Sequence, residues 1–441
     1  MSTDPYAARR RRVLDLLDER GAMILPAAPE IVVGRDVELR YVVDPDLWYL
    51  TGYTEPEAVA VLCPSADAPF TMFVRGRDPA HERWTGPREE PEAVGARIGA
   101  DVATVDELNG KLPGLIQGAD RIFFRIGTGR DDVEALVLDI MGGGRAARQR
   151  SGRGPAELVD PGLLLDEMRL VKEPGEIAAI RDAVAITVAA FRDGFAVAAP
   201  GAGEWQVEAA IEAGFRSAGA DGPAFATIAA SGPNATVLHY TANRRTMEPG
   251  DLLLIDAGTR HRMYNADLTR TIPVDGRFHG PAGDVYDAVL AAERAAIAAV
   301  RPGASTDDVH QAALRVLIPA MVDLGLVERG LPHDDTHELL EREDAWKPFF
   351  PHSTAHWLGL DVHDVGTYSV GDQPRPLEPG MVLTVEPGLY VPPDHPDAPD
   401  HLRGIGVRIE DDVLVTHHGR DVLSADLPTD PAELTALLSA R

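Results

Sequence analysis

Two stretches of this chain repeat each other, RTMEPGDLLLIDAG at residues 245–258 and RPLEPGMVLTVEPG at residues 375–388. In each copy a Pro-Gly pair precedes a short apolar run, which predicts a turn followed by a buried strand. Each strand ends at a carboxylate, Asp256 in the first copy and Glu386 in the second. The repeat therefore predicts two equivalent units, each with an acid at the end of a buried strand.

Each strand is expected to return as a hairpin that carries a second acid. The first returns over residues 263–272 after a polar tip at 259–262, and the second returns over residues 404–412 after a loop rich in Pro, Asp and His. We expect Asp267 to mirror Asp256 across the first tip, as Glu410 mirrors Glu386 across the second loop. Residues placed in this way on antiparallel strands face each other, so we expect two facing pairs of carboxylates.

Such pairs need a compensating cation. Like charges opposite each other destabilise a sheet, and burying several carboxylates together is costly unless a cation neutralises them. A single acid of this kind is more often a solvated strand end, or an ion-pair partner of Arg270 or Arg408. Two symmetric pairs favour a metal site instead.

A further ligand is expected from the segment between the two copies. Residues 349–366 are apolar, are interrupted by glycines, and contain three of the fourteen histidines, namely His352, His356 and His363. A lone histidine there would more often pack in the core, but three beside four acids favour a site. Four carboxylates and an imidazole suit manganese or a related divalent ion. Two ions roughly 3.5–4 Å apart would lower the pKa of a bridging water and supply hydroxide for hydrolysis.

The chain is long enough, at 441 residues, for two domains. Apolar runs at 58–62 and 70–74 alternate with helical patterns, which predicts an amino-terminal α/β domain. Downstream, helices expected at 174–197, 206–218 and 282–300 flank the two hairpins, which predicts an α+β catalytic half. A passage rich in Gly, Pro and Arg at 142–161 predicts a linker. We therefore place the domains at 1–170 and 171–441.

Asp256, Asp267, His356, Glu386 and Glu410, in this order and with the flanks quoted above, resemble the ligands of the dinuclear metallopeptidases of the pita-bread fold. Within that group the chain is most similar to the Xaa-Pro aminopeptidases (aminopeptidase P). SGPNATVLHYT at 231–241 and DLWYLTGYTEPEA at 46–58 also carry the resemblance. It implies a pita-bread catalytic domain with pseudo-twofold symmetry, preceded by a smaller α/β domain. The implied reaction releases the first residue from peptides with proline at the second position (Xaa-Pro-Yaa).

The resemblance assigns the five ligands individually to two divalent ions, for which manganese is favoured. Asp256 would bind one ion, and His356 and Glu386 would bind the other. Asp267 and Glu410 would bridge both ions. None of these positions is substituted, which argues against the catalytically dead relatives of this fold and against its metal-free amidinohydrolases.

The resemblance also assigns the surrounding residues. Glu386 would carry a proton from the attacking water to the leaving proline nitrogen. His239 and His363 match outer-shell histidines that donate to the carbonyl oxygen as charge develops. His352 and Arg408 match residues that line the proline side or hold a bridging carboxylate, although Arg408 could equally be a structural ion-pair residue.

Three alternatives remain open from the sequence. A prolidase shares the fold, the metals and the five ligands but cuts only Xaa-Pro dipeptides. A methionine aminopeptidase does not need the long amino-terminal α/β domain. A pita-bread binding or scaffold protein would not need an intact ligand set.

Composition limits partners and location. A formal net charge of -28 disfavours nucleic acid and anionic membranes as partners. Cys63 is the only cysteine, no apolar span reaches membrane length, and the first residues lack a signal-peptide core, so a cytoplasmic location is expected. The resemblance implies a homo-oligomer, a dimer or tetramer, in which Trp84 could close over a neighbour's active site; Trp84 could equally be an ordinary half-buried aromatic.

Overall fold

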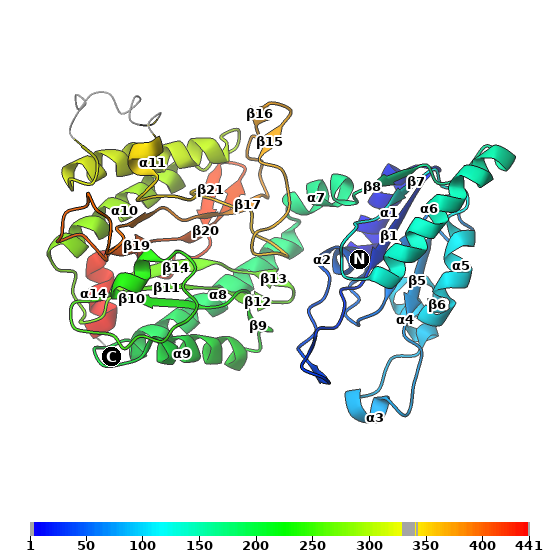
Figure 1. Ribbon diagram of the computed structural model, residues 1–441, viewed down its shortest axis with the longest axis horizontal. Coiled ribbons are helices and arrows are strands. Elements are labelled where there is room, and N and C mark those ends of the chain that lie inside the picture. Colours follow the sequence, from blue (N-terminus) through cyan, green and yellow to red (C-terminus); the bar gives the residue numbers. More distant parts are fainter. Residues whose placement is uncertain (1–3, 329–339, 341–342, 440–441) are drawn as a thin grey trace. The chain divides into compact units, whose positions relative to one another are not determined.

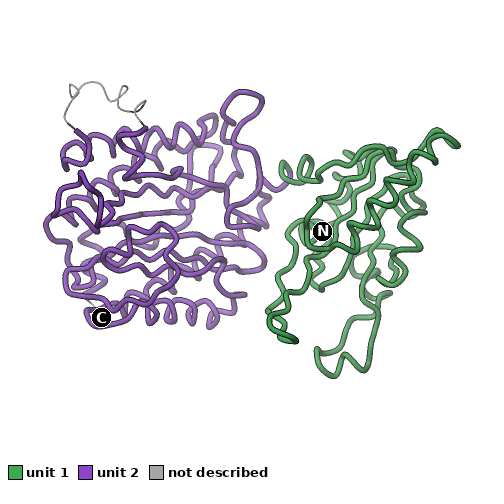
Figure 2. The backbone as a smooth tube through the Cα atoms, in the orientation of Figure 1, with its two compact units in different colours: residues 1–167 green, residues 168–441 purple. Residues whose placement is uncertain are grey.

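The structure, a computed structural model, describes residues 4–328, 340 and 343–439. The chain divides into two compact units, Met1–Glu167 and Met168–Arg441 (Figure 2). Within the described residues, no helix combines the length and the apolar character needed to cross a membrane.

The first unit is built on one six-stranded mixed sheet with the strand order β6-β5-β4-β1-β7-β8. Leu108 and Leu112 of helix α5, with Val133 and Val137 of helix α6, pack in the core against the sheet residue Ile24. The elements in chain order are α1 (Pro5–Leu17), β1 (Gly21–Pro26), β2 (Val32–Val33), β3 (Val37–Glu38), α2 (Pro45–Thr51), β4 (Val59–Leu62), β5 (Phe70–Val74), α3 (Glu82–Thr85), α4 (Pro91–Ile98), β6 (Asp101–Thr104), α5 (Leu108–Leu115), β7 (Arg121–Phe123), α6 (Asp131–Ser151), β8 (Glu157–Val159) and α7 (Gly162–Leu170), which crosses the boundary between the units.

The linker predicted at residues 142–161 is wrong. Its first part is the second half of α6, and residues 157–159 form β8 at the edge of the sheet. A Cβ at Gly144 would collide with the carbonyl oxygen of Pro155, so this glycine permits close packing between the helix and the following segment. Gly152 ends the helix in the left-handed conformation, with φ 75°. These glycines serve packing and capping, which composition does not distinguish from flexibility.

The second unit has helix pairs on both sides of its strands. Helix α8 packs on α9 and α10 packs on α11, and Figure 1 shows the central strands between the two pairs. The main elements are α8 (Pro174–Val197), α9 (Glu204–Ser217), β9 (Gly222–Pro223), β10 (Ile228–Ser231), β11 (Leu252–Ala257), β12 (Thr259–His261), β13 (Tyr264–Asn265), β14 (Leu268–Pro273), α10 (Gly280–Ala299), α11 (Thr306–Asp323), α13 (Glu343–Trp346), β15 (Ser369–Val370), β16 (Gln373–Pro374), β17 (Val382–Val385), β18 (Gly388–Tyr390), β19 (Gly406–Arg408), β20 (Asp411–Thr416), β21 (Gly419–Val422) and α14 (Pro431–Ser439).

The two sequence repeats form corresponding antiparallel pairs, β11–β14 and β17–β20, and each pair belongs to a three-stranded sheet, β10-β11-β14 or β17-β20-β21. A pair of backbone hydrogen bonds between Thr269 and Glu410 joins the two halves of the unit, with N–O distances of 3.4 and 3.1 Å. The predicted helix at 174–197 is confirmed as α8, which begins with Pro174 and a reciprocal cap between Glu173 and Glu176.

The register of the first hairpin differs from the prediction by two residues. Asp256 pairs with Thr269, and not with Asp267. The tip is the two-residue turn Arg262–Met263 between the paired residues 261 and 264, and both turn residues have positive φ, 50° and 72°. An offset of two residues keeps a strand's side chains on the same face, so Asp267 still lies near Asp256.

The second hairpin keeps the predicted register. Val385 pairs with Asp411, and Gly388 pairs with Arg408. Positions 386 and 410 therefore lie opposite each other between these two paired segments.

Candidate active site

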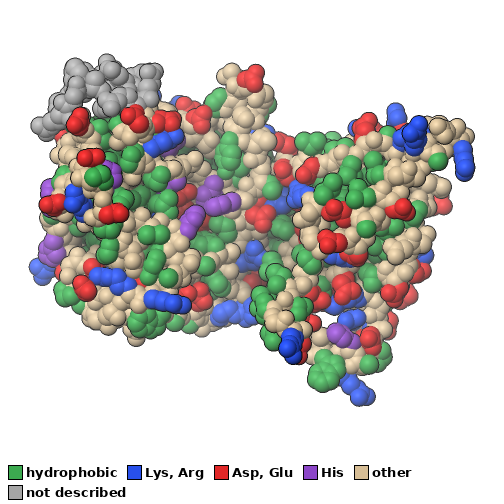
Figure 3. All heavy atoms as spheres, in the orientation of Figure 1, with side chains coloured by type: hydrophobic (Ala, Val, Ile, Leu, Met, Phe, Trp, Pro, Cys, Tyr) green, Lys and Arg blue, Asp and Glu red, His purple; other side chains and the backbone are tan. Residues whose placement is uncertain are grey.

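A pocket of about 950 Å³ opens in the second unit. Histidine side chains reach the surface of this unit on the face shown in Figure 3. The pocket is lined by every residue that the sequence proposed for the site, namely His239, Asp256, Asp267, His352, His356, His363, Glu386, Arg408 and Glu410. Residues from both repeats and from the segment between them therefore meet in one place.

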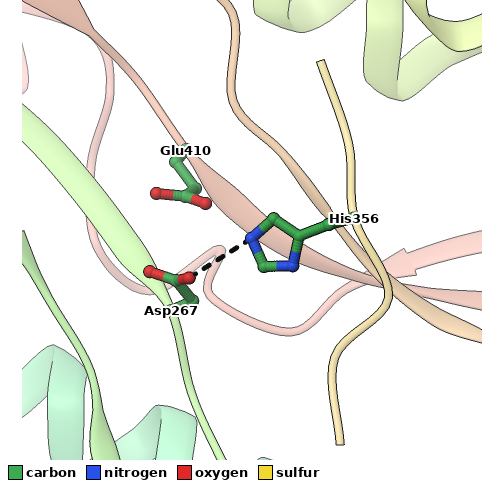
Figure 4. Close-up of side chains that lie close together, drawn as sticks. All are labelled: Asp267, His356 and Glu410. Atoms are coloured by element: carbon green, nitrogen blue, oxygen red, sulfur yellow. Dashed lines mark ion pairs between the residues drawn. The ribbon is translucent and has the colours of Figure 1, made fainter. Parts of the chain in front are cut away.

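Asp267, His356 and Glu410 form the centre of this group. Their ligand atoms all lie within 4.8 Å of one another, and Figure 4 shows the three side chains pointing toward a common point. His356 Nε2 lies 3.4 Å from Asp267 Oδ2. Asp267 immediately precedes β14 and Glu410 lies between β19 and β20, so the centre forms where the two halves join.

Asp256 and Glu386 border this group. Glu386 Oε1 lies 3.8 Å from His356 Nε2, and its Oε2 lies 3.8 Å from His352 Nδ1. Asp256 Oδ2 accepts a hydrogen bond of 2.5 Å from Arg408 Nη2. Its other oxygen, Oδ1, is buried and accepts no hydrogen bond from the described residues.

The hydrogen bonds of His356 fix which ring nitrogen is available. Nδ1 lies 3.0 Å from the carbonyl oxygen of Trp357, which can only accept, so Nδ1 carries the proton. In the neutral ring, Nε2 therefore presents a lone pair toward Asp267. A lone pair facing a carboxylate is unfavourable unless a cation lies between them, and this is the arrangement of a metal-binding histidine.

The carboxylates are poorly compensated by the protein itself. Burial, with the nearby charge of Asp256, raises the pKa of Asp267 well above its usual range. Burial, with the charge of Asp267, does the same for the pKa of Glu410. Burial raises the pKa of Glu386 to about 7, although His356 and Arg408 act in the opposite direction. The unpartnered Asp256 oxygen, the His356 lone pair and these raised pKa values fit a site for divalent cations.

Arg408 connects the acids to His352 through the hydroxyl group of Tyr390. Its Nη1 donates to the Tyr390 hydroxyl at 2.9 Å, and its Nε donates to Thr269 Oγ1 at 3.2 Å. The Tyr390 hydroxyl is also 2.9 Å from His352 Nε2, and His352 Nδ1 is 2.8 Å from the carbonyl oxygen of Ser353. His352 is thus held in one orientation, and burial, with the charge of Arg408, lowers its pKa to about 4. It is neutral at neutral pH.

Sequence reasoning missed two residues that hold the acids. Thr269 Oγ1 donates to Glu410 Oε2 at 2.7 Å, and Asp412 Oδ2 accepts from the backbone N–H of Asp267 at 3.1 Å. Both residues lie two positions beyond a predicted acid, Asp267 or Glu410, and the two-residue period of a strand could have identified them.

Comparison with known proteins agrees with this geometry. The sequence model of metallopeptidase family M24 matches residues 178–417, and that of the aminopeptidase P N-terminal domain matches residues 6–123. This chain belongs to metallopeptidase family M24. It is therefore an enzyme, and its second unit has the pita-bread fold of the family behind an aminopeptidase P N-terminal domain.

The similarity extends over the whole chain. An Xaa-Pro aminopeptidase of Escherichia coli is 38% identical over 448 residues, which cover 100% of this chain and 98% of that protein. The structure of proline aminopeptidase P II from Yersinia pestis superposes with a TM-score of 0.93 at 39% identity and covers 100% of both chains. A variant of Escherichia coli aminopeptidase P in complex with substrate gives a TM-score of 0.92 at 38% identity, covering 99% of this chain and 98% of that one.

Proposed function

We propose that this enzyme releases the first residue from peptides with proline at the second position, with two divalent metal ions in the pocket. The observation that carries the proposal is the convergence of Asp267, His356 and Glu410 within 4.8 Å. Asp256 and Glu386 beside them complete the ligand set. Because four of the five ligands are carboxylates, we favour Mn²⁺.

The reaction needs an activated water and a proton carrier. Two bound divalent ions would lower the pKa of a shared water and supply hydroxide near neutral pH. Glu386 is the proton carrier, because its carboxylate borders the central group on the side of His352. It takes the proton at one carboxylate oxygen and returns it to the proline nitrogen as the peptide bond breaks.

Two histidines complete the reacting end of the pocket. His239 and His363 line it, and the His363 ring centroid lies 4.3 Å from that of His356. An imidazole N–H at this position can donate to the substrate carbonyl oxygen as negative charge develops on it. Both residues act on the substrate in this proposal and bind no ion.

The proline side is assigned to His352, which lines the pocket. Behind it the His352 ring packs on the buried rings of Phe350 and Tyr390, with ring centroids 4.8 and 5.6 Å away. Once a proline nitrogen is in a peptide bond it has no N–H to donate, so an apolar, ring-shaped surface suffices to recognise it. The Tyr390 hydroxyl is already occupied by Arg408 and His352.

The start of α11 also lines the pocket, and we assign it to the residues that follow proline. Thr306, Asp307 and His310 line this end, and His310 lies 5.6 Å from Phe350 between ring centroids. A prolidase must hold the free carboxylate that follows proline, which requires a cation. Asp307 is an acid and repels that carboxylate, which favours substrates that continue beyond proline.

We further propose a cytoplasmic homo-oligomer. The first unit exposes apolar side chains along its β2–β3 hairpin, including Ile31 (56% exposed) and Val37 (58% exposed). Trp84 on α3 is 87% exposed, so the alternative of an ordinary half-buried aromatic is wrong. Exposed apolar groups of this kind favour an interface with another copy. Light scattering on the purified protein tests this, and a monomer at micromolar concentration would contradict it.

Three substrates test the proposed reaction. The purified enzyme, stripped of metal and reloaded with Mn²⁺, is offered an Xaa-Pro-Yaa tripeptide, an Xaa-Pro dipeptide and Met-Ala-Ser. We expect turnover of the tripeptide in preference to the others. Preferred turnover of the dipeptide would identify a prolidase, and preferred turnover of Met-Ala-Ser would identify a methionine aminopeptidase.

A further inference from the structure

The segment between His356 and His363 is anchored by a buried cluster of charges. Lys172 Nζ lies 2.9 Å from Asp364 Oδ2, and Arg169 Nη2 lies 2.6 Å from Asp364 Oδ1. The Arg169 Nη2 atom also contacts Asp361 Oδ2 at 2.7 Å. The side chains of Lys172 and Asp364 are each 1% exposed and that of Arg169 is 2% exposed, so these three are shielded from solvent, whereas that of Asp361 is 40% exposed.

The two cations of the cluster favour the ionised form of Asp364. Burial acts to raise the pKa of Asp364, but Lys172 and Arg169 outweigh it and hold that pKa below its usual value. A buried ion pair of this kind contributes little net stability compared with well-packed apolar residues of the same size. The ion pairs instead fix the orientation of the Asp364 side chain, because several hydrogen bonds of fixed geometry meet at its carboxylate.

Asp364 is connected directly to the backbone that orients His356. The backbone N–H of Asp364 donates to the carbonyl oxygen of Trp357 at 2.9 Å. The same carbonyl oxygen accepts the Nδ1 proton of His356 at 3.0 Å. One carbonyl group therefore links the anchored residue to the ring that faces Asp267.

The turn that leads to His363 is also held on its other side. Asn265 Nδ2 donates to the carbonyl oxygens of Gly359 and Leu360, at 3.0 and 2.8 Å. A Cβ at Gly359 would collide with the Asp364 carboxylate, so the turn closes tightly over this side chain. His363 immediately precedes Asp364 and its ring packs edge-on to that of His356.

We propose that Asp364, anchored by Lys172 and Arg169, is a positioning residue that sets His363 relative to His356 for the reaction. This inference rests on the proposed function, because it assumes that His363 acts on the substrate. Loss of the anchor loosens the turn of residues 359–364 and displaces His363. A displacement of about 1 Å in a reacting group can cost on the order of 100-fold in rate.

The first test combines Asp364→Asn with His363→Ala. Alone, Asp364→Asn is expected to lower kcat roughly 10- to 100-fold at unchanged metal content. In the His363→Ala background the same change should cost less than about 2-fold, because residues that act through one another are not additive. An equal loss of kcat in both backgrounds, or loss of bound metal, would overturn the proposal.

Two further variants separate positioning from stability. Asp251→Asn breaks another pair of the second unit, that of Asp251 and Arg245, which does not contact the histidine segment. Asp251→Asn should change thermal stability but should leave the ratio of kcat between the wild-type and His363→Ala backgrounds unchanged. If Asp364→Asn does not fold, Lys172→Met is used instead, since it leaves the pair of Arg169 and Asp364 in place. It should lower kcat roughly 5-fold, and Lys172→Arg should restore most of that loss; failure of Lys172→Arg to do so would contradict the anchor.

Amide hydrogen exchange tests the anchoring of the turn independently of enzyme activity. In Asp364→Asn or Lys172→Met, the amides of residues 357–364 should exchange faster than in the wild type, while those of β11 should not. Unchanged exchange in this turn would overturn the proposal even if activity falls. Faster exchange with an enzyme that cleaves no proline peptide would show that the anchor exists and that the proposed function is wrong.

Discussion

Arg408 Nη2 donates to Asp256 Oδ2 at 2.5 Å, so an arginine of the second hairpin holds an acid of the first. Both side chains are buried, and Arg408 also contacts Thr269 of the first hairpin and Tyr390 of the second. Removing one partner of such a pair leaves the other buried and uncompensated, which is costly. The ion pair therefore ties the position of one proposed ligand to the correct docking of the two halves of the domain.

The paired carboxylates lead to a prediction about metal content. Asp267→Ala or Glu410→Ala should each lower the bound metal and abolish hydrolysis, because each change removes a proposed shared ligand. Elemental analysis of dialysed protein and a tripeptide assay measure the two effects. Asp251→Ala is the control, since this acid pairs with Arg245 outside the pocket. Full activity of the wild type after exhaustive chelation would sink the dinuclear proposal.

The raised pKa of Glu386 predicts how pH affects the stability of the metal-stripped protein. With a folded pKa of about 7 and a usual value near 4.5, the folded state binds more protons than the unfolded chain between these values. The free energy of unfolding that Glu386 contributes is therefore complete below about pH 4.5 and is lost as pH rises to 7. Between pH 5.5 and 8.0 this loss is about 2 kcal/mol.

Glu386→Gln isolates that contribution. The lowered pKa of His352 acts in the opposite direction, since burial disfavours its protonated form, but the variant retains this histidine. Denaturant unfolding at both pH values should show the wild type losing stability relative to Glu386→Gln. Saturating Mn²⁺ should remove the difference for the wild type. A wild type that gains stability relative to the variant as pH rises would contradict the burial of this acid.

The outer histidines predict a different result from the ligands. His239→Ala and His363→Ala should keep the metal content and lose turnover by roughly 100-fold or more, the scale of one transition-state hydrogen-bond donor. His279→Ala is the control, because its side chain is 63% exposed and lies outside the pocket. If either pocket variant instead loses an ion, that histidine is a ligand and its assignment here is wrong.

The sequence predicts the fold well where local chemistry and long-range pattern agree. Helix α8 has Pro174 and a reciprocal cap at its start, and the strands β11 and β17 follow equivalent Pro-Gly turns. The position of the acids follows from the repeat. It could therefore be found without knowing how the two halves dock.

The predictions from the sequence are wrong where one sequence pattern is compatible with two structures. The glycines of α6 look like a linker, because composition does not show that Gly144 packs against Pro155. The predicted register of the first hairpin is wrong by two residues because the turn lies at Arg262 and Met263. Both adopt positive φ, which is uncommon for residues with a side chain, so the sequence does not mark the turn there. The two-residue period of a strand points to Thr269 and Asp412, but their partners Glu410 and Asp267 lie in the other half of the unit, so local pattern alone does not specify these contacts.

The last prediction concerns specificity, because the same ions would serve several peptidases and only the surrounding pocket selects the substrate. Replacing proline at the second position by alanine should cost most of the rate, since alanine makes less contact than a proline ring with the pocket wall at His352. Extending the peptide beyond proline should not lower the rate, because we assign Asp307, which lines the pocket, to the part that receives the residues after proline, where it would repel a terminal carboxylate.

Rates on a dipeptide, a tripeptide and a longer peptide decide this point, and Asp307→Arg tests its cause. We expect cleavage after the first residue of the tripeptide and the longer peptide, faster than cleavage of the dipeptide. The charge reversal should raise the relative rate on the dipeptide roughly 3- to 10-fold, as expected for a partly solvated charge acting on a carboxylate. His279→Arg adds a positive charge away from the pocket and should not change the rate on the dipeptide relative to the tripeptide. Hydrolysis of the dipeptide alone by the wild type would mean that the pocket closes around a free carboxylate, and the enzyme would then be a prolidase.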